Sequence, residues 1–209
     1  MINAATAPLH SGWIKAHRAC RYVLLILGLL AISAGNPAVA AKVAGISLDE
    51  SIVHEGDELV LNGAGLRKRL FFKLYVGSLY VQNELAGGDA QSLIEADAPM
   101  LIQLNILSEL LTRDKMVDAL NEGFSKSTGG NVAPIQAQID EMINAFDQSI
   151  RPGETYRLAY HPDTGTSLLR EQETIATVSG LPFKQALFGI WLSDSPAQAS
   201  LKKAMLAGK

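Results

Sequence analysis

A stripe of apolar residues with helical periodicity runs from residue 135 to residue 150. Its members recur about every 3.6 positions, which places them on one face of a helix. Pro134 stands where a first helical turn tolerates proline, and Pro152 follows the end of the stripe. A second helix is predicted between Thr112, a favourable N-cap, and Gly129. Further helices are predicted at 89–96, from Pro182 onwards, and from Ser195-Pro196 towards Leu206.

Strand-like segments flank these helices on both sides. The longest, Leu70 to Val81, is rich in aromatic and β-branched residues, and both of its faces are largely apolar. It is therefore expected to be covered on both sides. A shorter strand before it ends at Asn62-Gly63, a typical turn pair. Strands in hairpin-like groups, separated from groups of helices, predict an α+β fold with an antiparallel sheet. The other predicted strands span about 100–107, 155–160, 167–170 and 174–178.

The amino-terminal segment has the order of a secretory signal peptide. Lys15, Arg18 and Arg21 precede an apolar run at 23–34, and the small residues that follow fit a cleavage site near Ala40. The run is about 12 residues long, whereas a membrane span needs roughly 20. We therefore predict a signal peptide at 1–40, one domain at 41–209, a periplasmic or secreted location and no stable membrane insertion after cleavage.

Charge and cysteine content exclude several classes of function. The whole chain has a formal net charge of −3, and loss of the three basic leader residues would make it about −6. An acidic domain without a basic cluster is a poor candidate for nucleic-acid binding. The single cysteine, Cys20, lies in the leader, so the mature domain has neither a thiol nucleophile nor a disulfide.

Common catalytic and cofactor motifs are missing from the sequence. It contains no G-x-S-x-G, no phosphate-binding loop and no G-x-G-x-x-G. Only His54 and His161 remain after the leader, and they lie far apart in the sequence. We therefore expect no metal site and no cofactor.

One segment offers chemistry that could hold an anion. Arg67 follows two glycines within a locally basic run, and a guanidinium matches a carboxylate with two parallel hydrogen bonds. Tyr75 adds a phenolic hydroxyl on an apolar strand. On one straight strand the two residues would lie about 26 Å apart, at roughly 3.3 Å per residue. To share a ligand, they need the chain to turn back between them, around 67–70, or another segment to bring them together. The alternative is that Arg67 belongs to a solvated basic turn and Tyr75 is an ordinary core residue.

The segment Leu-Asn-Gly-Ala-Gly-Leu-Arg at 61–67, followed by the strand at 71–81, resembles the core of the chalcone isomerase-like domain. The segment at 181–196 is similar to the carboxy-terminal motif of bacterial members of this family. The resemblance spans about residues 43–208. It implies an open-faced β-sandwich, in which a large antiparallel sheet carries a layer of helices with a ligand cleft between them.

The resemblance also bears on activity. Plant isomerases of this family close a flavanone ring, whereas related members bind fatty acids in the same cleft. Arg67 matches the cleft arginine of both branches, and Tyr75 matches the tyrosine that the fatty-acid-binding members pair with it. Ile190 stands where the isomerases carry serine or threonine, and it cannot hydrogen-bond a phenol. The segment between Arg67 and Tyr75 is, however, shorter here than in the plant proteins.

We therefore predict non-catalytic binding of a fatty acid or similar small amphipathic carboxylate by Arg67 and Tyr75. The alternatives are an intramolecular lyase or isomerase acting on an enone, and an interaction protein without a small ligand. In the isomerase reading, Arg67 would stabilise an oxyanion and Tyr75 would transfer a proton. Apolar lining of the cleft could come from Phe72, Val76, Leu120, Phe124, Leu187 and Trp191.

Overall fold

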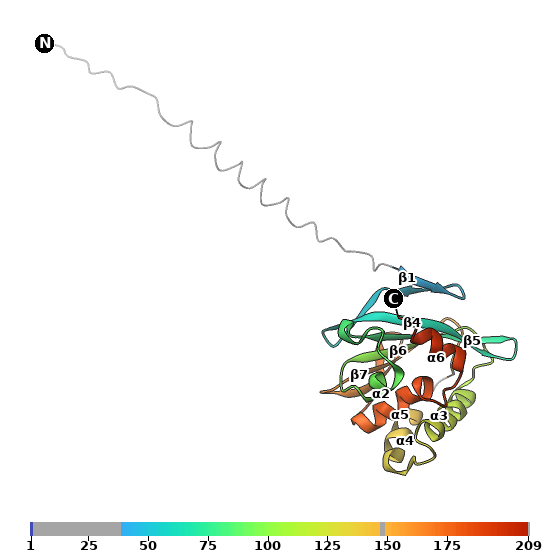
Figure 1. The fold of residues 1–209 in the computed structure, drawn as a ribbon. Coiled ribbons are helices and arrows are strands. Elements are labelled where there is room, and N and C mark those ends of the chain that lie inside the picture. Colours follow the sequence, from blue (N-terminus) through green and yellow to red (C-terminus); the bar gives the residue numbers. More distant parts are fainter. Residues whose placement is uncertain (2–38, 147–148, 209) are drawn as a thin grey trace. The chain divides into compact units, whose positions relative to one another are not determined.

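A computed structural model describes Met1 and residues 39–146 and 149–208. Its main feature is a seven-stranded antiparallel sheet in which the strands lie side by side in the order of the sequence (Figure 1). A separate hairpin, formed by β1 (Val39–Val43) and β2 (Ile46–Asp49), precedes it. The strands of the large sheet are β3 (Ser51–His54), β4 (Asp57–Arg69), β5 (Phe72–Val81), β6 (Met100–Ile106), β7 (Thr155–His161), β8 (Gly165–Arg170) and β9 (Glu173–Val178).

Helices gather on one face of this sheet (Figure 1). Helix α5 is central, since almost its entire length is buried between the sheet and the other helices. Thr112 caps α3 by accepting a hydrogen bond from the Lys115 backbone nitrogen, as its residue type predicts. The helical segments are η1 (Asn83–Leu85), α2 (Ala90–Glu95), α3 (Arg113–Ser127), η2 (Ala133–Ile135), α4 (Gln136–Asn144), α5 (Leu181–Leu192) and α6 (Ala199–Met205).

The sheet separates two hydrophobic cores. The larger core lies between the sheet and the helices, and Leu79 and Val81 of β5 contribute to it. The smaller core lies on the opposite face, where Val76 and Tyr80 of the same strand pack with residues of the β1–β2 hairpin. The prediction that this strand is covered on both sides is therefore confirmed. Each fully buried apolar side chain contributes about 1.5–3 kcal/mol to stability.

The turn predicted at Asn62-Gly63 was wrong, because β4 continues through it to Arg69. Asn62 Nδ2 instead donates a hydrogen bond to the Met205 carbonyl oxygen at 2.8 Å. A Cβ atom at position 63 would lie 2.3 Å from the Ala204 carbonyl oxygen. Gly63 therefore lets the end of α6 pack closely against the strand, and the Asn62 hydrogen bond holds it there.

Two helix boundaries also differ from the prediction. Helix α4 ends at Asn144, so Phe146 and Ile150 are buried from the segment that follows it. The last helix does not begin at Ser195-Pro196 but at Ala199, because the chain first folds back along α5. The Ala197 backbone nitrogen donates to the Ile190 carbonyl oxygen at 2.7 Å in this return.

The predicted signal peptide lies almost wholly outside the described residues. Val39 and Ala40 are the exception: they belong to β1, so the predicted cleavage point falls within this strand. Across residues 39–146 and 149–208, no helix has the length and apolar character needed to span a bilayer.

Candidate functional site

The β4–β5 hairpin brings Arg67 and Tyr75 together. The two residues are direct partners across the antiparallel pair, although eight positions separate them in the sequence. The chain reverses at Leu70-Phe71, which satisfies the geometric condition that the sequence imposes on this pair. A bulge between Arg67 and Lys68 shifts the register just before the turn.

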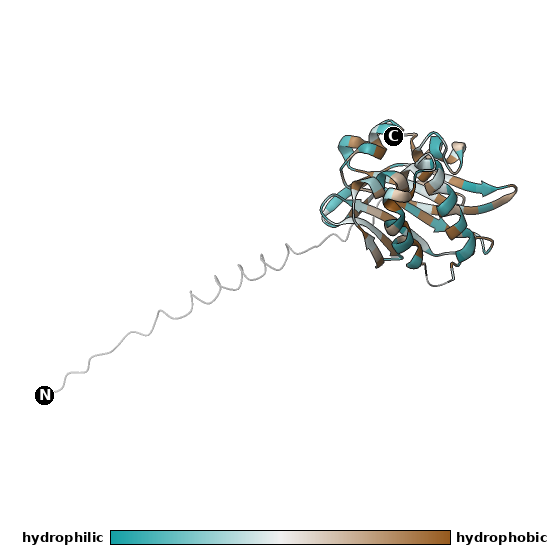
Figure 2. Cartoon of the chain, turned by 90° about the horizontal axis from the view of Figure 1, so that it is seen from below, coloured by the Kyte–Doolittle hydropathy of each residue, from teal (hydrophilic) through white to brown (hydrophobic). Residues whose placement is uncertain are grey.

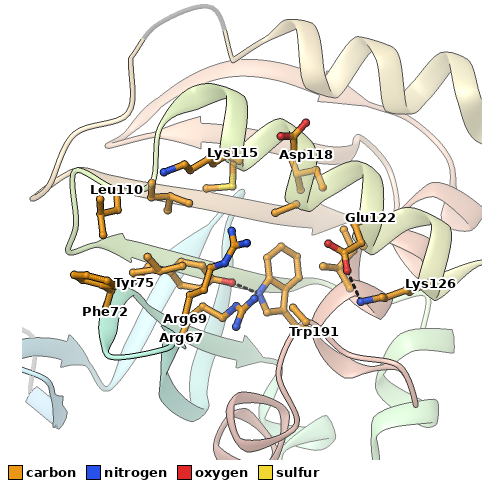
Figure 3. A pocket seen from close by; sticks show the side chains of 18 of the residues that line it. Arg67, Arg69, Phe72, Tyr75, Leu110, Lys115, Asp118, Glu122, Lys126 and Trp191 are labelled. Carbon is orange, nitrogen blue, oxygen red and sulfur yellow. Dashed lines mark hydrogen bonds and ion pairs between the residues drawn. The ribbon is translucent and has the colours of Figure 1, made fainter.

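Both side chains line a cavity of about 790 Å³ (Figure 3). Its walls come from the β4–β5 hairpin, the loop between β6 and α3, helix α3 and helix α5. Gly123 of α3 permits close packing of the two helices, since a Cβ atom there would lie 2.7 Å from Ile190 Cγ2. The deeper wall is apolar and buried, and is formed by Leu74, Leu111, Met116, Leu120, Ile190 and Trp191.

The Arg67 guanidinium is half-buried and held in place by its neighbours. Its Nη1 atom donates to the Lys68 carbonyl oxygen at 2.8 Å and to Gln198 Oε1 at 3.1 Å. Gln198 is itself fixed, because it also accepts from the Lys68 backbone nitrogen and donates to the Leu66 carbonyl oxygen. Neither bond of Arg67 uses Nε or Nη2, the edge that suits bidentate recognition of a carboxylate.

The Tyr75 hydroxyl is buried and oriented by Trp191, whose Nε1 donates to it at 3.0 Å (Figure 3). Burial raises the pKa of Tyr75, while the hydrogen bond from Trp191 and the nearby Arg67 guanidinium oppose this rise. The hydroxyl therefore keeps its proton at neutral pH. Because the indole occupies an acceptor site, that proton can be donated to an anion beside Arg67.

Cations outnumber anions around the cavity. Glu122 is paired with Lys126, and this hydrogen bond, with Arg67 and Arg69 as further contributions, lowers the pKa of Glu122. The excess of two positive charges favours a ligand with a negative group. The charged residues of the lining are Arg67, Arg69, Lys115 and Lys126 against Asp118 and Glu122.

Three of the six residues expected to form an apolar lining do line the cavity: Phe72, Leu120 and Trp191. Val76 faces the smaller core on the far side of the sheet, since it alternates with Tyr75 along β5. Phe124 and Leu187 are core residues of the helix layer outside the cavity lining.

The sequence did not reveal two polar contributions to the site. Trp191 was expected only as apolar lining, and a propensity argument has no signal for its hydrogen bond to Tyr75. Gln198 lies 131 positions from Arg67, so their contact depends on the return of the chain after α5. Lys115 could have been selected from the sequence, because its spacing places it on the side of α3 that bears Asp118 and Glu122.

The two histidines are close in the folded chain. Both His54 and His161 lie 3.8 Å from carboxylate oxygens of Glu55, and His161 Nε2 lies 3.2 Å from Asp57 Oδ2. Nevertheless, the described part of the chain holds no group of three or more His, Cys, Asp or Glu side chains with a geometry that could bind a metal ion.

The fold is an antiparallel sheet covered by helices, and a cavity lies between the β4–β5 hairpin and helices α3 and α5. The profile of the chalcone isomerase-like family matches residues 40–207, and the chain belongs to this family. No curated protein matches it in sequence. A similar solved structure is a fatty-acid binding protein from Arabidopsis thaliana, with a TM-score of 0.63 and 21% identity over 82% of this chain and 96% of the other. At this identity, the likeness shows the fold alone.

Proposed function

We propose that the protein binds a fatty acid or a similar small amphipathic carboxylate, with the head group between Arg67 and Tyr75. The observation that carries the proposal is the pairing of these residues on adjacent strands inside one cavity. The guanidinium would pair with the carboxylate, and the Tyr75 hydroxyl would donate to one of its oxygens. Charge-assisted hydrogen bonds of this kind are about twice as strong as neutral ones.

The rest of the cavity supports an apolar tail. Its volume of about 790 Å³ is within the range of small-molecule sites, roughly 300–1,000 Å³. Met116 and Leu120 of α3 line it, and Met adapts readily to flexible chains. Ile190 lies in the wall, where it supports binding of an apolar chain rather than the phenol chemistry of an isomerase.

The location that we propose is the periplasm or the cell exterior. It is supported by the order of basic, apolar and small residues in 1–40. A protein that binds an amphipathic acid in that compartment would hold the acid out of water without altering it chemically.

Calorimetric titration with palmitate tests the proposal. Arg67→Ala should weaken binding roughly 10- to 150-fold, because a hydrogen bond to a charged group contributes about 1.5–3 kcal/mol. Hexadecanol, which has the same chain and no charge, should lose little affinity in the same variant. Arg157→Ala is a matched control: Arg157 is also half-buried, but it bonds to Gln103 away from the cavity.

Equal affinity of wild type and Arg67→Ala for palmitate would refute the proposal. An absorbance assay of chalcone loss runs beside it. A rate above that of buffer, abolished by Arg67→Ala, would instead favour the isomerase reading of the same site.

A further inference from the structure

Three consecutive apolar side chains are exposed at the turn between β4 and β5. Leu70 is 84% exposed, Phe71 96% and Phe72 55%, and Leu110 of the neighbouring loop is 41% exposed. We name residues 68–73 the hairpin tip. Most other large apolar residues of the described chain are buried, so this clustering is unusual for a surface in contact only with water.

The hairpin tip is also basic. Lys68, Arg69 and Lys73 flank the apolar residues, and no acidic residue lies between positions 58 and 84. The chain as a whole is acidic, so positive charge is concentrated here against the overall balance. Figure 2 shows the hairpin projecting from the body of the domain, with hydrophobic and hydrophilic positions side by side.

The backbone of the tip suggests that its sequence is not selected for stability alone. Leu70 has a φ angle of +55°, a conformation that glycine or asparagine adopts at lower cost than leucine. A leucine side chain is therefore held in a strained turn and pointed into solvent. Strain retained at an exposed apolar residue favours a functional role for that side chain.

We propose that the hairpin tip docks on an anionic lipid bilayer. Leu70, Phe71 and Phe72 would enter the interfacial region, while Lys68, Arg69 and Lys73 would contact acidic head groups. Phenylalanine and leucine side chains of interfacial segments enter the boundary between head groups and acyl chains, and each basic residue near an anionic surface contributes about 1 kcal/mol. A narrow projecting turn suits insertion between lipids better than it suits a protein partner, which requires a broad complementary surface.

The same residues border the cavity. Arg69, Leu70, Phe72 and Leu110 all belong to its lining, so a docked tip would hold the cavity mouth against the membrane surface. An amphipathic acid could then enter from the bilayer without crossing water. This last step rests on the proposed function, whereas docking itself does not depend on what the cavity binds.

Vesicle co-sedimentation tests docking. The protein is expressed from its full sequence and mixed with vesicles of phosphatidylcholine alone or with added phosphatidylglycerol. Wild type should bind the anionic vesicles, and less so as salt is raised. Leu70→Ser/Phe71→Ser should weaken binding at least tenfold. Lys68→Gln/Lys73→Gln should weaken it roughly thirtyfold, at about 1 kcal/mol per charge.

Matched controls place the same changes elsewhere. Val53→Ser alters an apolar side chain that is 70% exposed on β3, and Lys42→Gln/Lys203→Gln removes two exposed charges outside the hairpin tip. Every variant keeps residues 1–38, so any contribution of that segment cancels in the comparison. Docking is overturned if the wild type does not bind anionic vesicles, or if the tip variants bind them as well as the controls. Palmitate titration of Lys68→Gln/Lys73→Gln in vesicle-free buffer should give wild-type affinity, because neither side chain lines the cavity. This result separates failure of docking from failure of the proposed function.

Discussion

Lys184 and Arg67 are two cations of this chain with contrasting surroundings. Lys184 of α5 is fully buried, and its Nζ donates to the carbonyl oxygens of Leu93, Ile94 and Ala96 at 2.7–2.9 Å. Arg67 is half-buried at a cavity, and its bonds to Lys68 and Gln198 use only one of its three nitrogens. The lysine has a partner for every proton, whereas the arginine retains donors for a further group.

This difference separates a structural cation from one suited to a ligand. Lys184 satisfies the carbonyl groups at the end of α2, which no residue of the helix itself can do. Its Nζ also lies 5.5 Å from the Tyr160 ring centroid and 5.3 Å from that of Phe188. Burial lowers the pKa of Lys184 to about 8, with Asp97 opposing the shift. A buried charge by itself therefore does not identify a site; its unused donors do.

The largest expected effect comes from removing the structural cation. Lys184→Met keeps the aliphatic chain but leaves three carbonyl oxygens without their donor, so the free energy of unfolding should fall by about 2–4 kcal/mol. Urea denaturation measures this loss. Palmitate affinity should not change, because Lys184 does not line the cavity.

Lys115→Met is the reciprocal control for that comparison. Lys115 is exposed and lines the cavity, so its removal should change stability by less than about 0.5 kcal/mol and reduce palmitate affinity instead. If Lys184→Met lowered affinity and left stability intact, the distinction between the two kinds of cation would be wrong.

A smaller effect is expected at the partner of Arg67. Tyr75→Phe removes the hydroxyl that faces the guanidinium and should weaken palmitate binding roughly tenfold, while hexadecanol binding changes little. Stability should also fall by about 1 kcal/mol, since Trp191 Nε1 loses its buried acceptor. Calorimetry with both ligands measures the first effect. Equal losses for palmitate and hexadecanol would indicate altered packing rather than a lost hydrogen bond.

Local patterns in the sequence predicted most of the fold. Period-two and period-3.6 spacing located most strands and helices, and Thr112 identified the start of α3. These signals failed where a distant segment decides the local conformation. Asn62-Gly63 reads as a turn, yet the close approach of α6 requires just these residues within a strand. No pattern predicted β1 to β3, which are short and irregularly apolar.

The site was predictable to the same extent. Arg67 and Tyr75 could be selected from residue type and from the family resemblance, and a turn between them was a geometric requirement. The parts that orient them could not be selected. Trp191 and Gln198 reach the hairpin from the carboxy-terminal segment, and their hydrogen bonds depend on packing of α5 and on the return of the chain after it.

The smallest expected effect has the opposite sign and concerns the hairpin tip beside Arg67. Leu70→Gly removes the side chain from a residue with φ of +55°, so the free energy of unfolding should rise by up to about 1 kcal/mol. The same change should weaken binding to anionic vesicles, since the exposed leucine is lost. Urea denaturation and co-sedimentation on one sample measure both. A variant that gained stability without losing vesicle binding would show that the strained leucine is not used for docking. Strain at the tip would then have no link to function.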